Sequence, residues 1–339
     1  MHGLLAYGIY VQHYRLDCAA LGQALGVSAG KGTRSVASYD EDSTSMGVEA
    51  ARAALRMAPG VTPAAVYFAT ADPGYLDKTN ATAIHAALAL PANAGAFDMI
   101  GSVRSGAGTL RAALDARRPT LAVLSDVRTG LPAGGDEREG GDGAAAFLCG
   151  DDVAGTVIAE PIALASASAE FLDRWRVPGE SASLQWEERF GEHVYLPLAK
   201  SAVAEALKQA GIEGSALHHV IVAGPHGRAA KSAARAVGAK PEALGDDLTG
   251  VIGNLGTAHA GVLLADALDR ASADQLIAVV SLADGADVSI WRTTGALTER
   301  RPALSVAKRV ADGGAAGGSG SGRRGGSRLI TPRHVRNVA

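Results

Sequence analysis

The chain has 339 residues, of which 47% are hydrophobic and 4% aromatic, and its formal net charge is −3. A chain of this length buries a large core, and its nearly balanced charge gives no electrostatic basis for binding nucleic acid. No apolar run approaches the ~18–20 residues of a membrane span, so the sequence argues against both nucleic acid and membrane as partners.

The two cysteines, Cys18 and Cys149, form no metal-ligand cluster, and we expect no metal site. They fit small buried residues of a reduced, cytoplasmic protein better than a disulfide. The first eight residues lack a charged region and a cleavage site, so we expect no signal peptide.

Strand-like apolar runs alternate with helix-like runs along the chain. The expected strands are 66–69, 120–124, 144–148, 219–222 and 276–280. The expected helices are 45–57, 79–90, 106–116, 198–210, 228–237 and 260–271. Asp42 and Ser43 are candidate N-caps of the first helix. This alternation predicts βαβ units and a largely parallel sheet, with residues 1–160 and 195–300 built on a similar plan.

Two segments do not follow this plan. Residues 171–190 hold Trp175 and Trp186 amid charges, which fits an insertion beside a functional site, a dimer contact or an ordinary surface insertion. Residues 312–328 are nearly all Gly, Ala, Ser and Arg and cannot bury enough apolar area to order themselves. The arginines of this tail leave a second interpretation open, that it docks to an acidic partner.

Four segments in a fixed order resemble one superfamily of enzymes. They are the first strand and turn at 7–16, the acidic helix start at 40–51, the Gly-Asp-Gly-Ala strand at 141–147 and the Gly-Asn turn at 252–256. Together they resemble the thiolase superfamily, specifically bacterial and archaeal 3-hydroxy-3-methylglutaryl-CoA synthases and their β-ketoacyl synthase III relatives. The resemblance covers about residues 3–305.

The resemblance implies an α/β thiolase fold, with two pseudo-repeated βαβαβ halves in a five-layer αβαβα arrangement. We expect an N-terminal half over 1–165, an inserted loop region over 166–195, a C-terminal half over 196–305 and a disordered tail over 306–339. The resemblance also implies a homodimer that joins or breaks carbon–carbon bonds beside a thioester. Its substrate would be a coenzyme A thioester, with no permanently bound cofactor.

Such chemistry needs a nucleophile at a helix N-terminus, donors for an enolate or oxyanion, and a base for the α-proton. Residues 96–110 have the expected strand, turn and small-residue helix. Placing the family's glycine at Gly106 puts Val103 at the position of the nucleophilic cysteine, beside Ser102. A serine hydroxyl needs a neighbouring base to act as a nucleophile, so the alternative is that Ser102 caps the helix. In either case the backbone N–H groups of Val103 and Arg104 could hold a carbonyl oxygen.

The family's base and histidine are also displaced. The resemblance places Thr70 at the glutamate position, with Asp72 two residues on; the alternative for Asp72 is an ordinary turn aspartate before Pro73. It places Ala223 at the histidine position and His226 at an asparagine position, on a loop that should face the same pocket.

Three further residues complete the candidate site. Asn254 matches its family counterpart directly; its alternative role is a turn of positive φ, which Asn tolerates. His259 follows at a helix start and either faces the cavity or packs against the buried helices. Arg104 would pair with a substrate carboxylate or a CoA phosphate, or form a structural ion pair.

Three functions remain open. The first is cysteine-free aldol or retro-aldol chemistry on an acyl-CoA, with His226, His259 and Asn254 as donors and acid/base groups, assisted by Asp72 or Tyr75. The second is acyl transfer through Ser102. The third is a non-catalytic subunit that associates with a zinc-ribbon/OB-fold protein.

Overall fold

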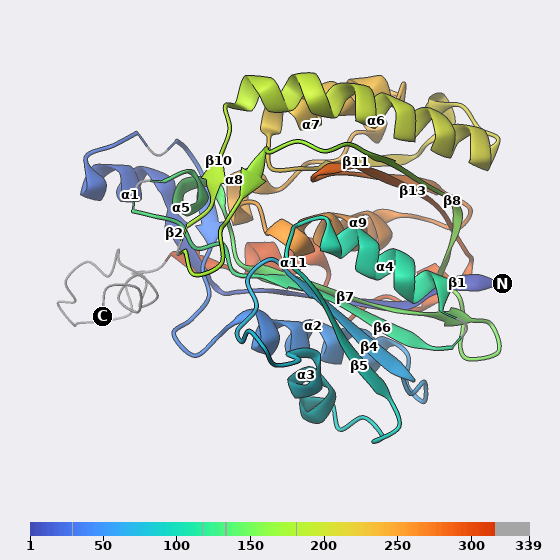
Figure 1. Cartoon of the computed structure of the whole chain (residues 1–339). Helices are drawn as coiled ribbons and strands as arrows, with labels where there is room; N and C mark the ends of the chain where they lie inside the picture. The colour runs from blue at the N-terminus through green and yellow to red at the C-terminus, as the bar shows by residue number, and fades with distance from the viewer. Residues whose placement is uncertain (29, 117, 133, 181, 316–339) are drawn as a thin grey trace.

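The computed structural model describes residues 1–28, 30–116, 118–132, 134–180 and 182–315. Figure 1 shows five layers, of which the outermost are helical. One outer layer holds α6 (Glu188–Ala210) and α7 (Gly227–Ala236), and the opposite one holds α2 (Ser43–Met57) and α3 (Ala81–Ala87). The central layer holds α4 (Ser105–Asp115) and α9 (His259–Arg270). This is the αβαβα arrangement that the resemblance predicts.

Two layers of strands separate these helices. The strands of the first half are β1 (His2–Val11), β4 (Ala65–Thr70), β5 (Gly95–Ile100), β6 (Thr120–Asp126) and β7 (Gly143–Asp151). Those of the second layer are β8 (Ala159–Ser168), β11 (His219–Ala223), β12 (Leu276–Leu282) and β13 (Gly285–Thr293). A single pair, Leu4 with Ala159, joins the layers into the strand order β11-β12-β13-β8-β1-β7-β6-β4-β5.

The expectation of a largely parallel sheet is wrong, because the sheet is mixed. Parallel pairing occurs between β4 and each of β5 and β6, and between β11 and β12. The pairs of β7 with β1 and β6, and of β13 with β12 and β8, are antiparallel. The connection from β12 to β13 is only Ala283 and Asp284, and such a short turn can join only antiparallel strands.

Every predicted strand and helix is present, most with boundaries shifted by a few residues. Asp42 is confirmed as the N-cap of α2: its side chain accepts from the Ser45 amide at 2.7 Å, and the Ser45 hydroxyl accepts from the Asp42 amide at 2.8 Å. Ser43 is instead the first residue of α2. The helix predicted from 198 begins at residue 188, because Pro197 lies inside α6 rather than before it.

The smaller elements lie at the periphery. A three-stranded sheet holds β14 (Gly314–Ala315), β2 (Tyr14–Asp17) and β3 (Thr33–Ser35), and β9 (Arg174–Trp175) pairs with β10 (Leu184–Gln185). The short α-helices are α1 (Cys18–Leu25), α5 (Gly135–Glu139), α8 (Thr249–Ile252), α10 (Ala296–Glu299) and α11 (Val306–Ala311). The 3-10 turns are η1 (Gly214–Ala216), η2 (Pro241–Ala243) and η3 (Gly256–Ala258).

Two expected boundaries move. The tail expected from residue 306 begins later, because α11 is folded and Val306 is buried, with its amide donating to Asp269 at 2.6 Å. Residues 316–339, the rest of that tail, lie outside the described residues. Of the inserted region expected over 166–195, the ends belong to β8 and α6, so the connecting segment is 169–187.

Small residues bring the central helices close to their neighbours. A Cβ at Gly106 of α4 would lie 2.4 Å from the carbonyl oxygen of Thr257, and one at Gly261 of α9 would lie 2.9 Å from Ala145 Cβ. Both contacts are too short for any larger residue. The two helices therefore begin side by side at the centre of the molecule, which is where the candidate residues gather.

Two further features are the lengths of the apolar helices and the state of the two cysteines. No helix within the described residues is long and apolar enough to cross a membrane. Both cysteines are free and buried, as expected. Burial raises the pKa of both thiols, which keeps them protonated and unreactive.

Candidate functional site

The turn between β5 and α4 holds Ser102 and Val103, the position that the resemblance assigns to a nucleophile. Gly101 has φ +125°, a conformation that side chains rarely adopt. The Ser105 amide donates to the Ser102 carbonyl at 3.1 Å, and the N-cap of α4 is Arg104 with no side-chain capping bond. The interpretation of Ser102 as a helix cap is therefore wrong, and its side chain is left on the wall of a cavity.

Two cavities meet at this turn, and a third adjoins one of them. The inner cavity, about 180 Å³, lies between α4, α9 and the second layer of strands, and Val103, Ala223, Asn254 and His259 are on its walls. These include the positions that the resemblance assigns to the family's cysteine and histidine. The two positions thus lie on the wall of one cavity, where this chain has Val and Ala.

The outer cavity, about 410 Å³, lies on the other side of Val103. Its walls include Asp72 and Ser102. Much of the rest comes from the connecting segment, residues 173–180 and 183. Val103, Arg128, Pro225 and Ala283 line both the inner and the outer cavity, so the two spaces adjoin.

The side cavity, about 480 Å³, approaches the inner cavity from the direction of α1 and α5. Its walls include Lys31 and Arg138, and it shares Gly224, Pro225, Asn254 and His259 with the inner cavity. The candidate residues thus do not share one cavity. Asn254 and His259 lie between the inner and side cavities, whereas Ser102 and Asp72 line the outer one.

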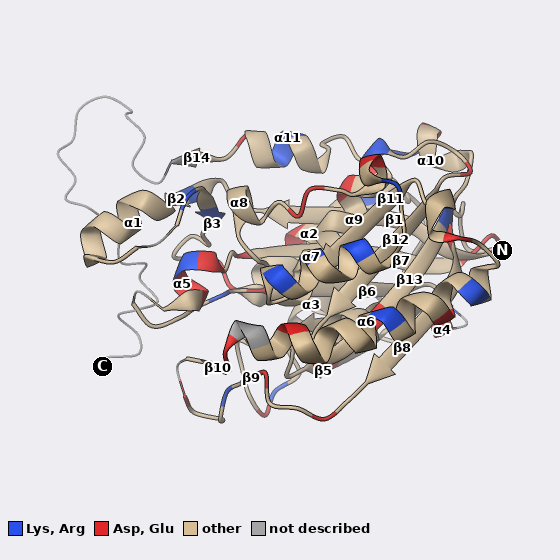
Figure 2. Cartoon of the chain, turned by 90° about the horizontal axis from the view of Figure 1, so that it is seen from above, with Lys and Arg blue, Asp and Glu red and all other residues tan. Residues whose placement is uncertain are grey.

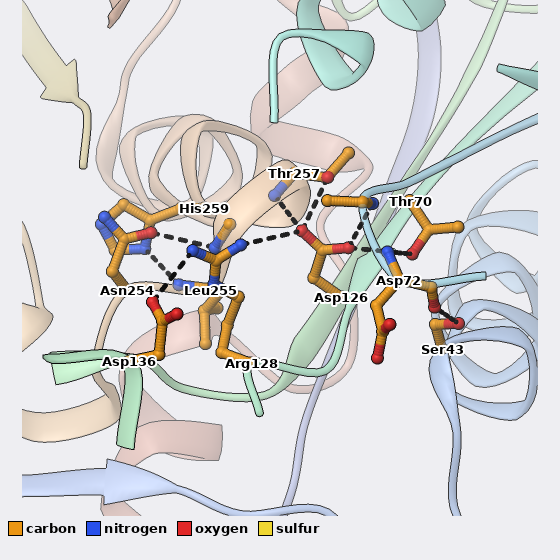
Figure 3. A network of polar contacts seen from close by, with 12 residues as sticks. Ser43, Thr70, Asp72, Asp126, Arg128, Asp136, Asn254, Leu255, Thr257 and His259 are labelled. Atoms are coloured by element: carbon orange, nitrogen blue, oxygen red, sulfur yellow. Dashed lines mark hydrogen bonds and ion pairs between the residues drawn. The ribbon is translucent and has the colours of Figure 1, made fainter. Parts of the chain in front are cut away.

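Asn254 ties two loops together at the inner cavity. Its Nδ2 donates to the Gly224 carbonyl at 2.8 Å, and its Oδ1 accepts from the Gly256 amide at 2.9 Å. The positive φ angles of this turn belong to Gly253 (+74°) and Gly256 (+56°) and not to Asn254. The turn-geometry role suggested for Asn254 is therefore wrong; the side chain holds the loop after β11 against the start of α9 (Figure 3).

His259 is buried at the start of α9 and lies close to Asn254 (Figure 3). Its Nδ1 accepts from the Leu255 amide at 3.4 Å, which assigns the ring proton to Nε2. Burial lowers the pKa of His259 to about 4, although Asp247 partly opposes the shift. The imidazole is therefore neutral at pH 7, and a hydrogen bond to the Asp247 backbone engages the ring on its other side.

His226 does not line any of the three cavities. Its side chain is turned toward the connecting segment, where Nε2 lies 2.6 Å from Asp173 Oδ1. The other oxygen of Asp173 accepts from the Tyr195 hydroxyl at 2.9 Å, and that hydroxyl in turn accepts from the Asp284 amide at 3.1 Å. All three side chains of this Asp–His–Tyr cluster are buried.

Asp126, at the end of β6, is the buried carboxylate of the site. Its Oδ1 accepts from the Thr70 hydroxyl at 2.8 Å and the Ala71 amide at 2.7 Å. Its Oδ2 accepts from both the amide and the hydroxyl of Thr257, each at 2.7 Å (Figure 3). Thr70, the residue at the glutamate position, is thus committed to Asp126 and faces away from the cavities.

Arg128 separates the inner and outer cavities. Its guanidinium lies 4.0 Å from Asp126 and 3.5 Å from Asp136, and its side chain is 10% exposed (Figure 3). Its Nε has no hydrogen-bond partner within the described residues, although it is buried. Burial lowers the pKa of this guanidinium, but an arginine remains charged near neutral pH.

Asp72 and Arg104 both form ion pairs. Asp72 Oδ1 lies 3.1 Å from Arg176 of the connecting segment. Arg104 pairs with Asp287 at 2.9 Å and donates to the Asp284 carbonyl at 2.7 Å, so of its two predicted roles the structural ion pair is present. Tyr75 is 62% exposed and outside all three cavities.

Sequence reasoning missed Asp126, Arg128 and Asp173. Asp126 carried a signal, since it is a charged residue directly after a continuous apolar strand. Asp173 carried no such signal. It lies in a segment without helical or strand periodicity, and its partners Tyr195 and His226 are 22 and 53 residues away along the chain. Among the described residues, no group of three or more His, Cys, Asp or Glu is placed to hold a metal ion.

The comparisons with known proteins agree with this geometry. No family model matches the sequence. The chain is 28% identical to a hydroxymethylglutaryl-CoA synthase of Pyrococcus furiosus over 84% of this chain and 83% of that one. It is also 28% identical to that of Methanothermobacter thermautotrophicus, over 91% and 93% of the two chains. The chain is a homologue of hydroxymethylglutaryl-CoA synthases.

Solved structures of this homologous group and of ketoacyl synthases share the fold. The curacin-pathway HMG synthase, in complex with a holo donor acyl carrier protein, has a TM-score of 0.79 at 19% identity, covering 93% of this chain and 86% of that one. The 3-oxoacyl-(acyl carrier protein) synthase III of Pseudomonas aeruginosa has a TM-score of 0.73 at 19% identity, covering 86% and 98%. The predicted thiolase fold is confirmed.

Proposed function

We propose that this protein makes or breaks a carbon–carbon bond next to an acyl thioester, by aldol or retro-aldol chemistry without a covalent cysteine intermediate. The observation that carries the proposal is the inner cavity. Its walls hold Asn254 and a neutral His259, together with Val103 and Ala223, which the resemblance aligns with the family's cysteine and histidine. Relatives of the chain are hydroxymethylglutaryl-CoA synthases by name, and one solved neighbour is complexed with CoA.

The polar groups at the inner cavity can stabilise an enolate. In the retro-aldol direction, a base takes the proton of a β-hydroxyl, the bond between the α- and β-carbons breaks, and the electron pair moves onto the thioester oxygen. A neutral N–H donor in a water-poor site is well suited to that developing charge. The second Nδ2 hydrogen of Asn254 supplies such a donor, and the buried, neutral His259 beside it keeps that end of the cavity free of a second charge.

Two carboxylates of the outer cavity are available to exchange the proton. Asp72 pairs with Arg176, which favours its charged form. Burial raises the pKa of Asp284, and the neighbouring Asp173 raises it further. Because a catalytic base works best with a pKa near the working pH, Asp284 is the stronger candidate.

The side cavity fits the arm that carries the acyl group. Lys31 and Arg138 stand on its walls, and the open N-terminus of α7 at Gly227 faces it. The charged residues of α7 are Arg228, Lys231 and Arg235, all cationic and exposed (Figure 2). Such a surface attracts the phosphates of CoA or an acidic acyl carrier protein.

The decisive experiment measures turnover of a panel of β-hydroxyacyl-CoA thioesters by the parent protein and by the double variant Cys18→Ala/Cys149→Ala, because both thiols are buried and resist alkylation. We expect turnover that survives removal of both thiols and falls at least a hundredfold in Asn254→Ala and Asp284→Asn. The exposed Asp274→Asn serves as the matched carboxylate control. Turnover abolished in a folded double variant, or absent across the whole panel, would reject the proposal.

Acyl transfer through Ser102 is the alternative within the same site. Its side chain reaches the outer cavity, but no base is hydrogen-bonded to its hydroxyl within the described residues. A serine without a base is a poor nucleophile. Mass spectrometry of the Ser102 peptide after incubation with acetyl-CoA should therefore show no added acetyl group, and an acetylated peptide would favour this alternative.

Two assembly states complete the proposal. We propose a homodimer through the edge strand β5, which pairs only with β4 within the described residues and exposes Phe97 (53%) and Ile100 (39%). A zinc-ribbon/OB-fold partner, in a non-catalytic complex, is the other assembly. Purification from the native host separates the two, because a stoichiometric small zinc protein would accompany the chain only in the second.

A further inference from the structure

The inner cavity changes in character along its length. At one end lie the first residues of α4 and α9 with the turn between β12 and β13, and here stand Arg104, Arg128, Asn254, His259 and Asp287. Further along the same elements most of the walls are apolar: Leu110 and Leu114 of α4, Leu264 of α9, Val279 of β12 and Trp291 of β13, with Arg111 of α4, which pairs with Asp115, as the charged residue of this part. The cavity therefore has a polar end beside the candidate site and an apolar interior.

The pairing of β8 with β13 agrees with this change from a polar end to an apolar interior. Ser166 of β8 pairs with Asp287 at the polar end, whereas Leu164 pairs with Ser289 one step further in. The Ser289 hydroxyl accepts from Trp291 Nε1 at 2.8 Å, so the indole N–H is already satisfied. Leu110 is five residues beyond Ser105, the first residue of α4, which corresponds to about 7.5 Å at 1.5 Å per residue.

An empty cavity at the centre of a protein lowers its free energy of unfolding, because the side chains around it lose packing contacts. An apolar cavity of about 150 Å³ is large enough to bind benzene, a ligand of six carbons. The inner cavity, at about 180 Å³, has room for slightly more. A two-carbon acetyl group, such as the one on the acetyl donor acyl carrier protein bound to the curacin-pathway HMG synthase, would leave most of it empty.

We propose that the inner cavity binds the aliphatic chain of the acyl thioester, with room for about six to eight carbons. The inference rests on the proposed function, since it places the thioester at the polar end near Asn254 and His259. It goes further by naming the substrate class: a medium-chain acyl group, with the α-carbon beside Val103 and the chain directed toward Leu110 and Trp291.

The test measures binding instead of turnover, so that it stays separate from the chemistry. S-alkyl-CoA thioethers with chains of 2 to 12 carbons are unreactive, and their affinities can be determined by titration calorimetry with CoA alone as the reference. We expect each added methylene to tighten binding by up to about fourfold, with the gain ending at six to eight carbons. An affinity independent of chain length would overturn the inference while leaving CoA binding intact.

Two variants of α4 should move that limit in opposite directions. Ala107 and Leu110 both line the cavity. Ala107→Leu fills it and should shorten the limit by about three carbons, whereas Leu110→Ala enlarges it and should lengthen the limit by a similar amount. Ala204→Leu, on the exposed face of α6, is the matched control and should change nothing.

A second ligand series distinguishes failure of this inference from failure of the proposed function. Straight-chain carboxylates of 4 to 12 carbons share the chain but lack CoA. If no CoA thioether binds but the carboxylates show the chain-length limit and its shift in Leu110→Ala, the cavity holds an aliphatic chain and the CoA proposal is wrong. If neither series depends on chain length, the medium-chain inference is rejected.

Discussion

His259 illustrates how burial sets the state of one titratable group. Its pKa of about 4 in the folded protein compares with an ordinary value of 6.5. The unfolded chain therefore binds a proton at this residue below about pH 6.5, whereas the folded protein does so only near pH 4. The stability contributed by the neutral imidazole is complete above pH 6.5 and is lost progressively as the pH falls toward 4.

We therefore predict that His259→Gln weakens the pH dependence of stability. The pKa difference corresponds to about 3 kcal/mol between pH 7 and pH 4, and the variant should lose most of that slope. Urea unfolding at several pH values in this range measures it. The exposed His193→Gln should retain the slope of the parent protein; equal slopes in all three proteins would contradict a buried, neutral His259.

Single residues also show which parts of the candidate site could be predicted from the sequence. Asn254 was predicted from the resemblance and His259 from its place at the start of the following helix, and the structure brings both to one cavity. The expectation that the loop holding His226 faces that pocket was wrong for the side chain, since Asp173 draws the imidazole to the connecting segment. A contact between residues 53 apart leaves no periodic signal, so only the fold could show it.

At the scale of elements, the connecting segment is held to both halves by charged side chains. Asp173 contacts His226 and Tyr195, Arg174 pairs with Asp136 at 2.5 Å, and Arg176 pairs with Asp72. These contacts explain how a segment with few apolar residues keeps a defined position over the outer cavity. Asp173 is buried, so water cannot replace its hydrogen bonds to His226 and Tyr195.

Removing that contact should loosen the segment. We predict that Asp173→Ala accelerates tryptic cleavage after Arg174 and Arg176 by about tenfold or more, because a charge-assisted hydrogen bond contributes about 1.5–3 kcal/mol. Mass spectrometry of timed digests identifies the sites. Glu180→Ala changes an exposed residue of the same segment and should leave the rate unchanged; equal rates in the two variants would show that Asp173 does not hold the segment.

Most elements were predictable because their patterns are local. The capping box of Asp42 and Ser45 and the continuous apolar run of β6 each specify an element without help from distant residues. Strand direction was not predictable in the same way. The antiparallel pairing of β12 with β13 depends on a turn formed by Ala283 and Asp284 alone. Asp284 adopts a positive φ of +47° in that turn, and the neighbouring residues in the sequence do not predict this conformation.

At the scale of the whole molecule, the nine-stranded order ends at β5 with an exposed apolar edge. A twofold contact would place each Phe97 at the interface twice, once from each protomer. We predict that Phe97→Lys raises the dissociation constant of the homodimer by about a hundredfold or more. Light scattering after size-exclusion chromatography measures the mass. Val153→Lys, at a residue 91% exposed elsewhere, should leave the mass unchanged, and a dimeric Phe97→Lys would place the interface on another surface.

Asp126 has a consequence for how this molecule can move. One carboxylate accepts hydrogen bonds from the end of β4 in the first half and from Thr257 at the start of α9 in the second. Hinge opening between the halves would remove both Thr257 donors from Oδ2 of this buried carboxylate and leave only the Thr70 and Ala71 donors on Oδ1, which costs free energy because a buried charge needs hydrogen-bond partners. This shared carboxylate therefore opposes hinge opening and favours a rigid frame made of the two halves.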